Sequence, residues 1–168
     1  MIRGNDLLSL VVLGLGSNLG DSYCIVQNAI KILNGFLQNL RCASLYKSAP
    51  LYVKDQGDFI NTAVSGFYER SPVELLALIQ QIEKDFGRER SKERRWGERS
   101  LDIDILLFGE LVLKEANLEI PHPRLNERRF ALEPLLELLP GALEPGTGLS
   151  YRCICDILPD QGTCKISS

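Results

Sequence analysis

Residues 101–108 read Leu-Asp-Ile-Asp-Ile-Leu-Leu-Phe, and the first five positions alternate between apolar side chains and carboxylates. Alternation with a period of two is typical of a β-strand, because successive side chains point to opposite faces of a sheet. We therefore expect Leu101, Ile103 and Ile105 on one face and Asp102 and Asp104 on the other. The two carboxylates, with Cβ atoms about 7 Å apart, could together ligate one or two divalent cations such as Mg²⁺.

A pair of aspartates can also be the solvated outer face of an amphipathic strand, although Asp is disfavoured in strands. The residues just before the strand add weight to the metal hypothesis. Residues 88–99 (RERSKERRWGER) contain five arginines and one lysine against three glutamates. Arginine matches phosphate oxygens bidentately, but a solvated loop of mixed charge could have the same composition. Carboxylates that hold metals beside arginines that hold phosphates are the arrangement that phosphoryl transfer requires.

The clearest helix of the chain follows Ser71. This serine can cap the helix, Pro72 suits the first helical position, and Glu74 completes a capping box. An apolar stripe typical of a helix that packs on a core then runs through Leu75, Leu76, Leu78, Ile79, Ile82 and Phe86. Gly87 is expected to end the helix.

Strands and helices alternate along the rest of the chain. The patterns predict strands at 10–15, 42–48 and 59–68, and helices at 21–37, capped by Asp21, and at 129–139. A short hairpin is expected around Gly109, and a tail rich in Gly and Pro follows the last helix. This mixture favours an α+β sandwich with helices packed on a mainly antiparallel sheet. A chain of 168 residues fits a single domain that spans residues 1–168.

The composition, with 45% hydrophobic and 24% charged residues, is that of a soluble globular protein. A net charge of -3 excludes nonspecific nucleic-acid binding by bulk charge alone. The apolar run at 7–15 could belong to a signal peptide, but Asp6 precedes it and no A-x-A site follows. We expect a buried strand there and a cytoplasmic protein. The five cysteines lack metal-site spacing and are expected to be reduced thiols packed as small apolar side chains.

The N-terminal glycines do not form a known nucleotide-binding motif. Gly14, Gly16 and Gly20 miss the Rossmann spacing by one residue, and the Gly-Lys-[Ser/Thr] of a P-loop is absent. A tight turn over residues 16–18 could still line a site. His122, which lies between two prolines, could face a ligand or be an ordinary loop histidine.

Residues 95–106 (RWGERSLDIDIL) resemble the hallmark of the 6-hydroxymethyl-7,8-dihydropterin pyrophosphokinase family of folate biosynthesis. Further similarity lies in the segments LGLGSNLGD, SLYKSAPL, DFINTAV, IEKDFGRER, IPHPRLNERRFAL and PLLEL. The resemblance covers about residues 11–140. The chain departs from the family pattern at Ala49 and Glu98, where proline is common, and residues 90–95 form a longer stretch than usual.

The resemblance implies that the pyrophosphoryl group of ATP moves to the pterin hydroxymethyl oxygen, with release of AMP. It also implies a ferredoxin-like core in a three-layer αβα sandwich. Two Mg²⁺ ions would be held by Asp102 and Asp104, and Arg88 and Arg99 would be catalytic. Contacts with ATP or its phosphates would come from Glu83, Arg90, Arg95, Trp96, Ile105, His122 and Arg128. The pterin pocket would consist of Phe59 and Phe130, which sandwich the ring, together with Ser48, Pro50, Leu51 and Asn61.

Two other functions stay open from the residues alone. A palm-type nucleotidyltransferase also uses strand-borne aspartates and two metals, but it releases pyrophosphate instead of AMP. A noncatalytic RNA-binding module could use a ferredoxin-like sheet with Phe59 and Phe130 beside a basic loop, but the RNP1 pattern is absent. We expect a monomer that acts on ATP and the pterin, without nucleic-acid or membrane partners.

Overall fold

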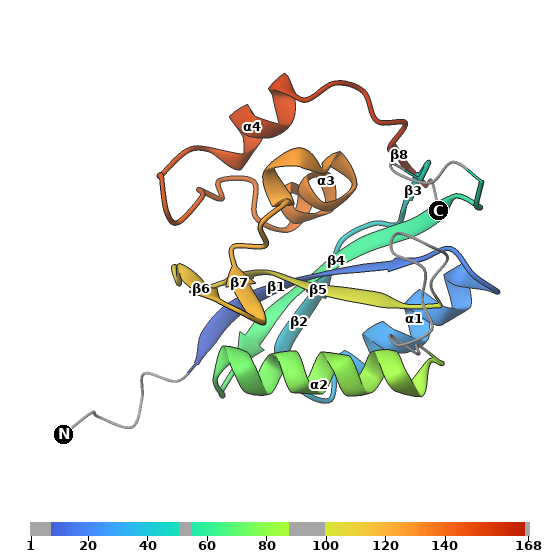
Figure 1. Ribbon diagram of the computed structural model, residues 1–168, viewed down its shortest axis with the longest axis horizontal. Coiled ribbons are helices and arrows are strands. Elements are labelled where there is room, and N and C mark those ends of the chain that lie inside the picture. The colour runs from blue at the N-terminus through green and yellow to red at the C-terminus, as the bar shows by residue number, and fades with distance from the viewer. Residues whose placement is uncertain (1–7, 51–54, 88–99, 167–168) are drawn as a thin grey trace.

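The computed structural model describes residues 8–50, 55–87 and 100–166 of the chain (Figure 1). The sequence predictions for Leu51, Arg88, Arg90, Arg95, Trp96 and Arg99 fall outside these residues. In the described part of the chain, no helix has both the length and the apolar character needed to cross a membrane.

Four α-helices, a six-stranded sheet and a two-stranded sheet make up the described structure. In chain order the elements are β1 (Ser9–Ser17), α1 (Ser22–Leu33), β2 (Gln38–Cys42), β3 (Tyr46–Ser48), β4 (Phe59–Tyr68), α2 (Pro72–Asp85), β5 (Asp102–Phe108), β6 (Leu113–Glu115), β7 (Leu118–Ile120), the 3₁₀ helix η1 (Leu125–Glu127), α3 (Arg129–Leu138), α4 (Tyr151–Ile157) and β8 (Cys164–Lys165).

The large sheet has the strand order β5-β1-β4-β3-β8, and β2 also pairs with β4. Every pairing in it is antiparallel. The strand β1 therefore lies between β4 and β5, while β6 and β7 form a separate antiparallel hairpin. The predicted mixture of helices with a mainly antiparallel sheet is confirmed.

Helices cover both faces of the large sheet, with α1 and α2 on one side and α3 and α4 on the other (Figure 1). Alternate residues of β1 and β5 supply the two cores. Leu13 and Ile103 pack in the cluster that contains residues of α1 and α2. Val12 and Leu106 pack in the cluster that contains residues of α3 and α4. The sheet is thus buried on both faces, with apolar side chains pointing alternately into each layer.

The helix α2 begins and ends where the sequence predicts. Ser71 Oγ accepts a hydrogen bond of 3.3 Å from Glu74 N, and Glu74 Oε2 accepts one of 3.0 Å from Ser71 N, which completes the capping box. Gly87 follows the helix with a φ of +85°, a conformation that glycine adopts without the steric cost of a side chain.

Residues 42–48 do not form the single strand that the sequence predicts. Cys42 lies opposite Val64 and Tyr46 lies opposite Asn61. The chain from Cys42 to Tyr46 is therefore one residue longer than the part of β4 that it faces. The extra residue breaks the ladder and separates β2 from β3, as a β-bulge does. Local sequence rules do not show a change of pairing register within a segment that is otherwise rich in β-forming residues.

Four further predictions are wrong. The first helix ends at Leu33 instead of near residue 37. The hairpin is formed by β6 and β7, whereas Gly109 lies in the turn after β5. The tail carries α4 and β8. All five cysteines are free thiols, but only Cys155 is buried, so the other four are not packed as apolar side chains.

Candidate active site

The two aspartates lie in a row of residues that crosses the sheet. Asp102 on β5 is paired with Gly16 on β1, and Gly16 is paired with Asn61 on β4. Residues directly opposite each other in antiparallel strands share a face, so Asp102 and Asn61 stand on the same face of the sheet, on either side of β1 and about 10 Å apart. Asp104 is paired with Gly14 in the next row on this face. We call it the carboxylate face; α3 and α4 cover its other end.

Glycines form the floor between the aspartates and Asn61. An ideal Cβ built at Gly16 would lie 3.0 Å from Asn61 Oδ1, and one built at Gly14 would lie 3.3 Å from Leu106 Cδ1. A side chain at Gly16 would therefore crowd the amide of Asn61. Neither glycine has a side chain of its own on this face, and the side chains of Leu106 and Asn61 lie over them. We call this stretch of β1, between the aspartates and Asn61, the glycine strip.

Asp104 has two basic neighbours on the carboxylate face. Its Oδ2 atom lies 3.6 Å from Arg128 Nη1 and 3.6 Å from His122 Nε2. Arg128 is a buried residue, and its guanidinium lies over the Phe130 ring at 5.6 Å from the centroid. Arg128 Nε is buried without a hydrogen-bond partner among the described residues. The guanidinium thus retains a free donor, and an anionic ligand beside Asp104 could accept a hydrogen bond from it.

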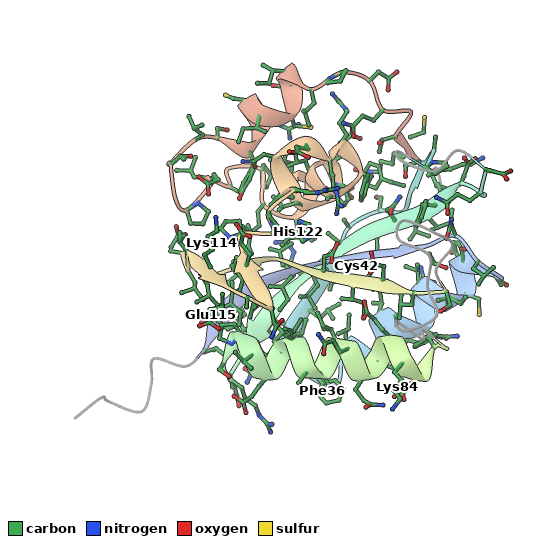
Figure 2. The ribbon with its side chains drawn as sticks, in the orientation of Figure 1. Phe36, Cys42, Lys84, Lys114, Glu115 and His122 are labelled. Carbon is green, nitrogen blue, oxygen red and sulfur yellow. The ribbon has the colours of Figure 1, made fainter. Side chains whose placement is uncertain are left out.

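The loop after β7 fixes the orientation of His122, which lies between the sheet and α3 (Figure 2). Its backbone nitrogen donates to Leu106 O at 3.1 Å, and its Nδ1 accepts from Arg124 N at 3.1 Å. A neutral imidazole that accepts at Nδ1 carries its proton on Nε2, the atom that faces Asp104. Burial, together with the Arg128 guanidinium, lowers the pKa of His122 to about 4. The ring is therefore a neutral donor at physiological pH.

The predicted pterin residues Asn61 and Ser48 are in contact on the carboxylate face. Asn61 Nδ2 donates a hydrogen bond of 2.8 Å to Ser48 Oγ, and both side chains are buried. This bond leaves Asn61 Oδ1 over Gly16 as an acceptor. Phe59 is two residues from Asn61 on the same face of β4. Phe130 lies in the first turn of α3, the helix that packs on β4. Pro50, half-buried, follows β3.

Two further predicted nucleotide contacts, Ile105 and Glu83, have buried side chains. Ile105 belongs to the core cluster on the α1 and α2 side, because it points to the opposite face from Asp104. Glu83 on α2 is also buried, and its Oε1 accepts a hydrogen bond of 2.8 Å from Ile103 N. Ile105 therefore points away from the aspartates, whereas Glu83 contacts the backbone of β5 between Asp102 and Asp104.

The segments that follow β1 and precede β4 are tied to each other. Asn18 Nδ2 donates to Gln56 Oε1 at 3.2 Å and to Gly57 O at 3.3 Å. Gly16 and Ser17 belong to β1, and the tight turn predicted at 16–18 comes later, where Gly20 has a φ of +72°. The bonds of Asn18 hold the start of α1 close to the segment that leads into Phe59.

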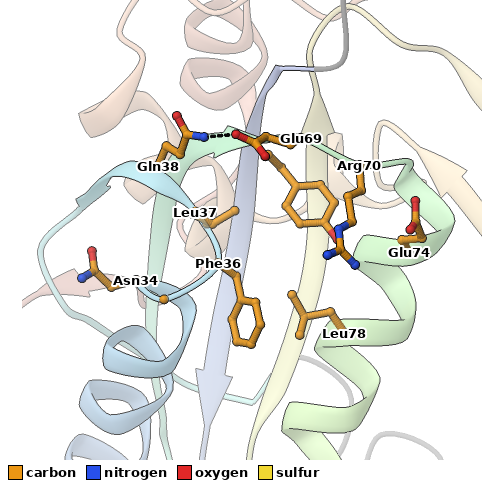
Figure 3. A pocket seen from close by; sticks show the side chains of 10 residues that line it. Asn34, Phe36, Leu37, Gln38, Glu69, Arg70, Glu74 and Leu78 are labelled. Carbon is orange, nitrogen blue, oxygen red and sulfur yellow. Dashed lines mark hydrogen bonds between the residues drawn. The ribbon is translucent and has the colours of Figure 1, made fainter. Parts of the chain in front are cut away.

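A separate pocket of about 540 Å³ lies at the other end of the sheet. Figure 3 shows its lining by the ends of α1 and β4 and the start of α2, including Phe36, Tyr68, Arg70 and Leu78. Tyr68 is paired with Ser9, at the opposite end of β1 from Gly16. The pocket is therefore remote from the aspartates.

The donor set on the carboxylate face fits a hydrated Mg²⁺ ion bound together with a phosphate ligand. Among residues 8–50, 55–87 and 100–166, no group of three or more His, Cys, Asp or Glu could hold a metal ion. Mg²⁺, however, is commonly bound through one or two carboxylates, with water and substrate phosphates as the other ligands. Asp102 and Asp104 supply such a pair on one strand.

Comparison with known proteins identifies the family. The sequence profile of 7,8-dihydro-6-hydroxymethylpterin-pyrophosphokinase (HPPK) matches residues 12–140, which include most of β1, the glycine strip, both aspartates and the helix α3. The chain belongs to the HPPK family. The predicted family resemblance is confirmed.

Curated relatives include single-function and bifunctional members of the HPPK family. The 2-amino-4-hydroxy-6-hydroxymethyldihydropteridine pyrophosphokinase of Aquifex aeolicus is 40% identical over 139 residues, covering 82% of this chain and 85% of that protein. The protein of that name from Bacillus subtilis is 39% identical over 132 residues, covering 77% and 78%. The mitochondrial folate synthesis bifunctional protein of Pisum sativum is 41% identical over 143 residues. The match covers 84% of this chain but only 27% of the pea protein.

The fold is also that of HPPK family members of known structure. The crystal structure of wild-type Plasmodium falciparum HPPK-DHPS with pteroate superimposes with a TM-score of 0.75 at 15% sequence identity. The superposition covers 96% of this chain and 48% of the Plasmodium chain.

Sequence patterns missed two residues that organise the layer on the carboxylate face. Gln161 bonds to the backbone on both sides of Arg128, and Glu137 on α3 bonds to Ser44 and to Tyr46, the first residue of β3. Neither residue lies in a motif of chemically active side chains. Their partners are distant in sequence, so a single sequence contains no local signal for these roles.

Proposed function

We propose that this HPPK family member transfers the pyrophosphoryl group of ATP to the hydroxymethyl oxygen of 6-hydroxymethyl-7,8-dihydropterin. In this reaction the hydroxyl oxygen forms a bond to the β-phosphorus of ATP and loses its proton. The bond between the β-phosphorus and the oxygen that bridges it to the α-phosphorus breaks, and AMP leaves with that oxygen. The products are AMP and the pterin pyrophosphate.

The observation that carries the proposal is the row from Asp102 through Gly16 to Asn61. In this row, carboxylates that would hold metal stand on one side of β1, and an amide suited to a heterocycle stands on the other. The separation of about 10 Å across two strand spacings suits a substrate pair whose phosphates and pterin ring must lie side by side. The names of the Aquifex and Bacillus relatives support the same substrate class.

Asp102 and Asp104 would hold the two Mg²⁺ ions. When bound, such ions neutralise the triphosphate and stabilise the charge that develops during in-line displacement. Arg128 would bind the transferred phosphates with the donor that the protein leaves free. His122 would donate from Nε2, and its lowered pKa keeps the ring neutral beside the positive charge of Arg128.

On the pterin side, Asn61 Oδ1 would accept from the donor edge of the heterocycle because its Nδ2 is already bonded to Ser48. Phe59 and Phe130 would stack on the two faces of the ring, a geometry that aromatic side chains favour. Pro50 and Leu51 would complete this pocket. These assignments follow the order of the family blocks in the sequence.

The remaining roles are proposed from sequence similarity alone. Arg88 and Arg99 would stabilise the transferring group, and Arg90, Arg95 and Trp96 would contact the nucleotide. Glu83 would act on ATP from α2, and Ile105 would contact the adenine side. A monomer in the cytoplasm, with small molecules as its only substrates, stays a prediction.

We also infer a ferredoxin-like core within a single domain that spans residues 1–168. Support comes from the chain order of β1, α1, β3, β4, α2 and β5, combined with the spatial order β5-β1-β4-β3. Both core clusters share one sheet, which is the arrangement expected of a single three-layer αβα domain.

The deciding experiment incubates the protein with ATP, Mg²⁺ and 6-hydroxymethyl-7,8-dihydropterin and follows the nucleotide products by chromatography. We expect AMP in equal amount to pyrophosphorylated pterin, and no AMP when the pterin is omitted. Release of pyrophosphate in place of AMP would favour the palm-type nucleotidyltransferase. Absence of turnover together with tight RNA binding would favour the noncatalytic module.

A further inference from the structure

The side chain of Gln161 brackets the backbone of Arg128. Gln161 Nε2 donates a hydrogen bond of 2.8 Å to Glu127 O, and Gln161 Oε1 accepts one of 2.9 Å from Arg129 N. These atoms belong to the two peptide units that join Arg128 to its neighbours. One amide side chain therefore fixes both bonds about which the Arg128 backbone could turn.

The local structure around Arg128 needs such an external partner. Arg128 lies between η1, which ends at Glu127, and α3, which begins at Arg129, and it has extended backbone angles of φ -124° and ψ 99°. No side chain at the N-cap position caps α3. The first N–H groups of a helix have no partner within the helix, so Gln161 supplies an acceptor from 32 positions farther along the chain.

Hydrogen bonds from α3 also hold the segment that leads to Gln161. Arg129 Nη1 donates to Cys155 O at 3.1 Å and to Leu158 O at 3.0 Å, where α4 ends. Residues 141–166 lie beyond the part of the chain that the HPPK profile matches. They are nevertheless bonded to the backbone that carries a site residue.

We propose that Gln161 is a positioning residue that holds the Arg128 guanidinium in its place beside Asp104 and Phe130. The inference rests on the proposed function, in which Arg128 binds the transferred phosphates. Its physical basis is the length of the arginine side chain, because a small rotation of the backbone moves the guanidinium much farther. A misplacement of about 1 Å at a reacting group can lower a rate on the order of 100-fold.

The test compares Gln161→Met, which removes both hydrogen bonds at similar volume, with Gln81→Met as a matched control. Gln81 lies exposed on α2, in the opposite layer, and donates one hydrogen bond of 2.7 Å to Asp85 Oδ1. We expect kcat for AMP formation to fall by about tenfold in Gln161→Met and to be unchanged in Gln81→Met. Gln161→Glu keeps an acceptor for Arg129 N and should recover part of the loss.

A double-mutant cycle with Arg128→Met separates positioning from a general loss of stability. If Gln161 acts through Arg128, adding Gln161→Met to Arg128→Met should cause little further loss of kcat, at temperatures below the unfolding transition of every variant. Additive losses, or an unchanged kcat in Gln161→Met with an active wild type, would overturn this inference alone. A wild-type protein that forms no AMP would overturn the proposed function and, with it, this inference.

Discussion

Glu83 Oε1 accepts a hydrogen bond of 2.8 Å from the backbone nitrogen of Ile103, the residue that separates Asp102 from Asp104. Among the described residues β5 is the end strand of the sheet, so no other strand there accepts from its outward N–H groups. A side chain from α2 supplies the acceptor instead. The helix therefore fixes the segment of β5 that carries both aspartates.

Replacing Glu83 should affect stability and activity together. Glu83→Ala leaves the buried Ile103 N–H without this acceptor, at a cost of about 1–3 kcal/mol in unfolding free energy, and should lower AMP formation by shifting β5. Ser71→Ala on the same helix should cost about 1 kcal/mol through loss of the cap, with unchanged activity. Urea unfolding and the AMP assay measure both effects. Equal activity in the two variants would contradict the role of Glu83 at β5.

Removing either aspartate should abolish most turnover and leave the fold intact. Asp102→Ala and Asp104→Ala should each lower kcat by at least about 100-fold, because neither carboxylate belongs to a core cluster and both would hold metal. Asp104→Ala should also destabilise the protein by about 1 kcal/mol, since Arg128 loses its carboxylate neighbour. Turnover and thermal unfolding check these outcomes. Near-native turnover in both variants would defeat the metal assignment.

The two floor glycines should respond differently to a single added methyl group. Gly16→Ala would bring a Cβ atom to 3.0 Å from Asn61 Oδ1, and we expect the KM for the pterin to rise by about tenfold. Gly14→Ala would bring a Cβ atom to 3.3 Å from the side chain of Leu106, which is buried in the core, so it should cost about 1–3 kcal/mol in stability and leave that KM near wild type. Steady-state kinetics at saturating ATP distinguish the two variants. Equal pterin KM values in the two variants would show that the space above Gly16 does not determine the position of the Asn61 amide.

Glu137 should contribute a pH-dependent part of the stability. Burial raises the pKa of its carboxyl, but hydrogen bonds from Ser44 and Tyr46 and the nearby Lys165 outweigh burial, so the pKa lies below the ordinary value of 4.5. The unfolded chain therefore takes up the proton first, and the stabilisation is present above the ordinary value and lost as pH falls below it. Glu137→Gln should be less stable by about 1 kcal/mol near neutral pH. The difference from wild type should shrink in acid, and a constant difference in chemical unfolding would contradict this.

Local sequence rules predicted the elements whose cause is local. Alternation placed Ile103 and Asp104 on opposite faces, and the cap and box at Ser71 located the start of α2. Both features depend on residues within a few positions of one another. Pattern and structure agree at these places because the same neighbours decide both.

The differences arise where distant pairing decides the structure. The break between β2 and β3 depends on the register against β4, and β8 is a strand only because Lys165 pairs with Tyr46. The relation of Asn61 to Asp102 across Gly16 likewise appears only when three strands are aligned. A single sequence carries the aspartates and the amide as separate motifs and does not state their distance.

The two glycines of β1 on the carboxylate face have a consequence for how selectivity can change. The main-chain groups of β1 already pair with β4 and β5, so a floor made of glycines offers a ligand few directional contacts of its own. Recognition would then come from the two neighbouring strands. Side chains of β5 would act on the anionic co-substrate, and side chains of β4 would bind the heterocycle. Substitutions on β4 could retune the accepted ring without disturbing the chemistry performed beside β5.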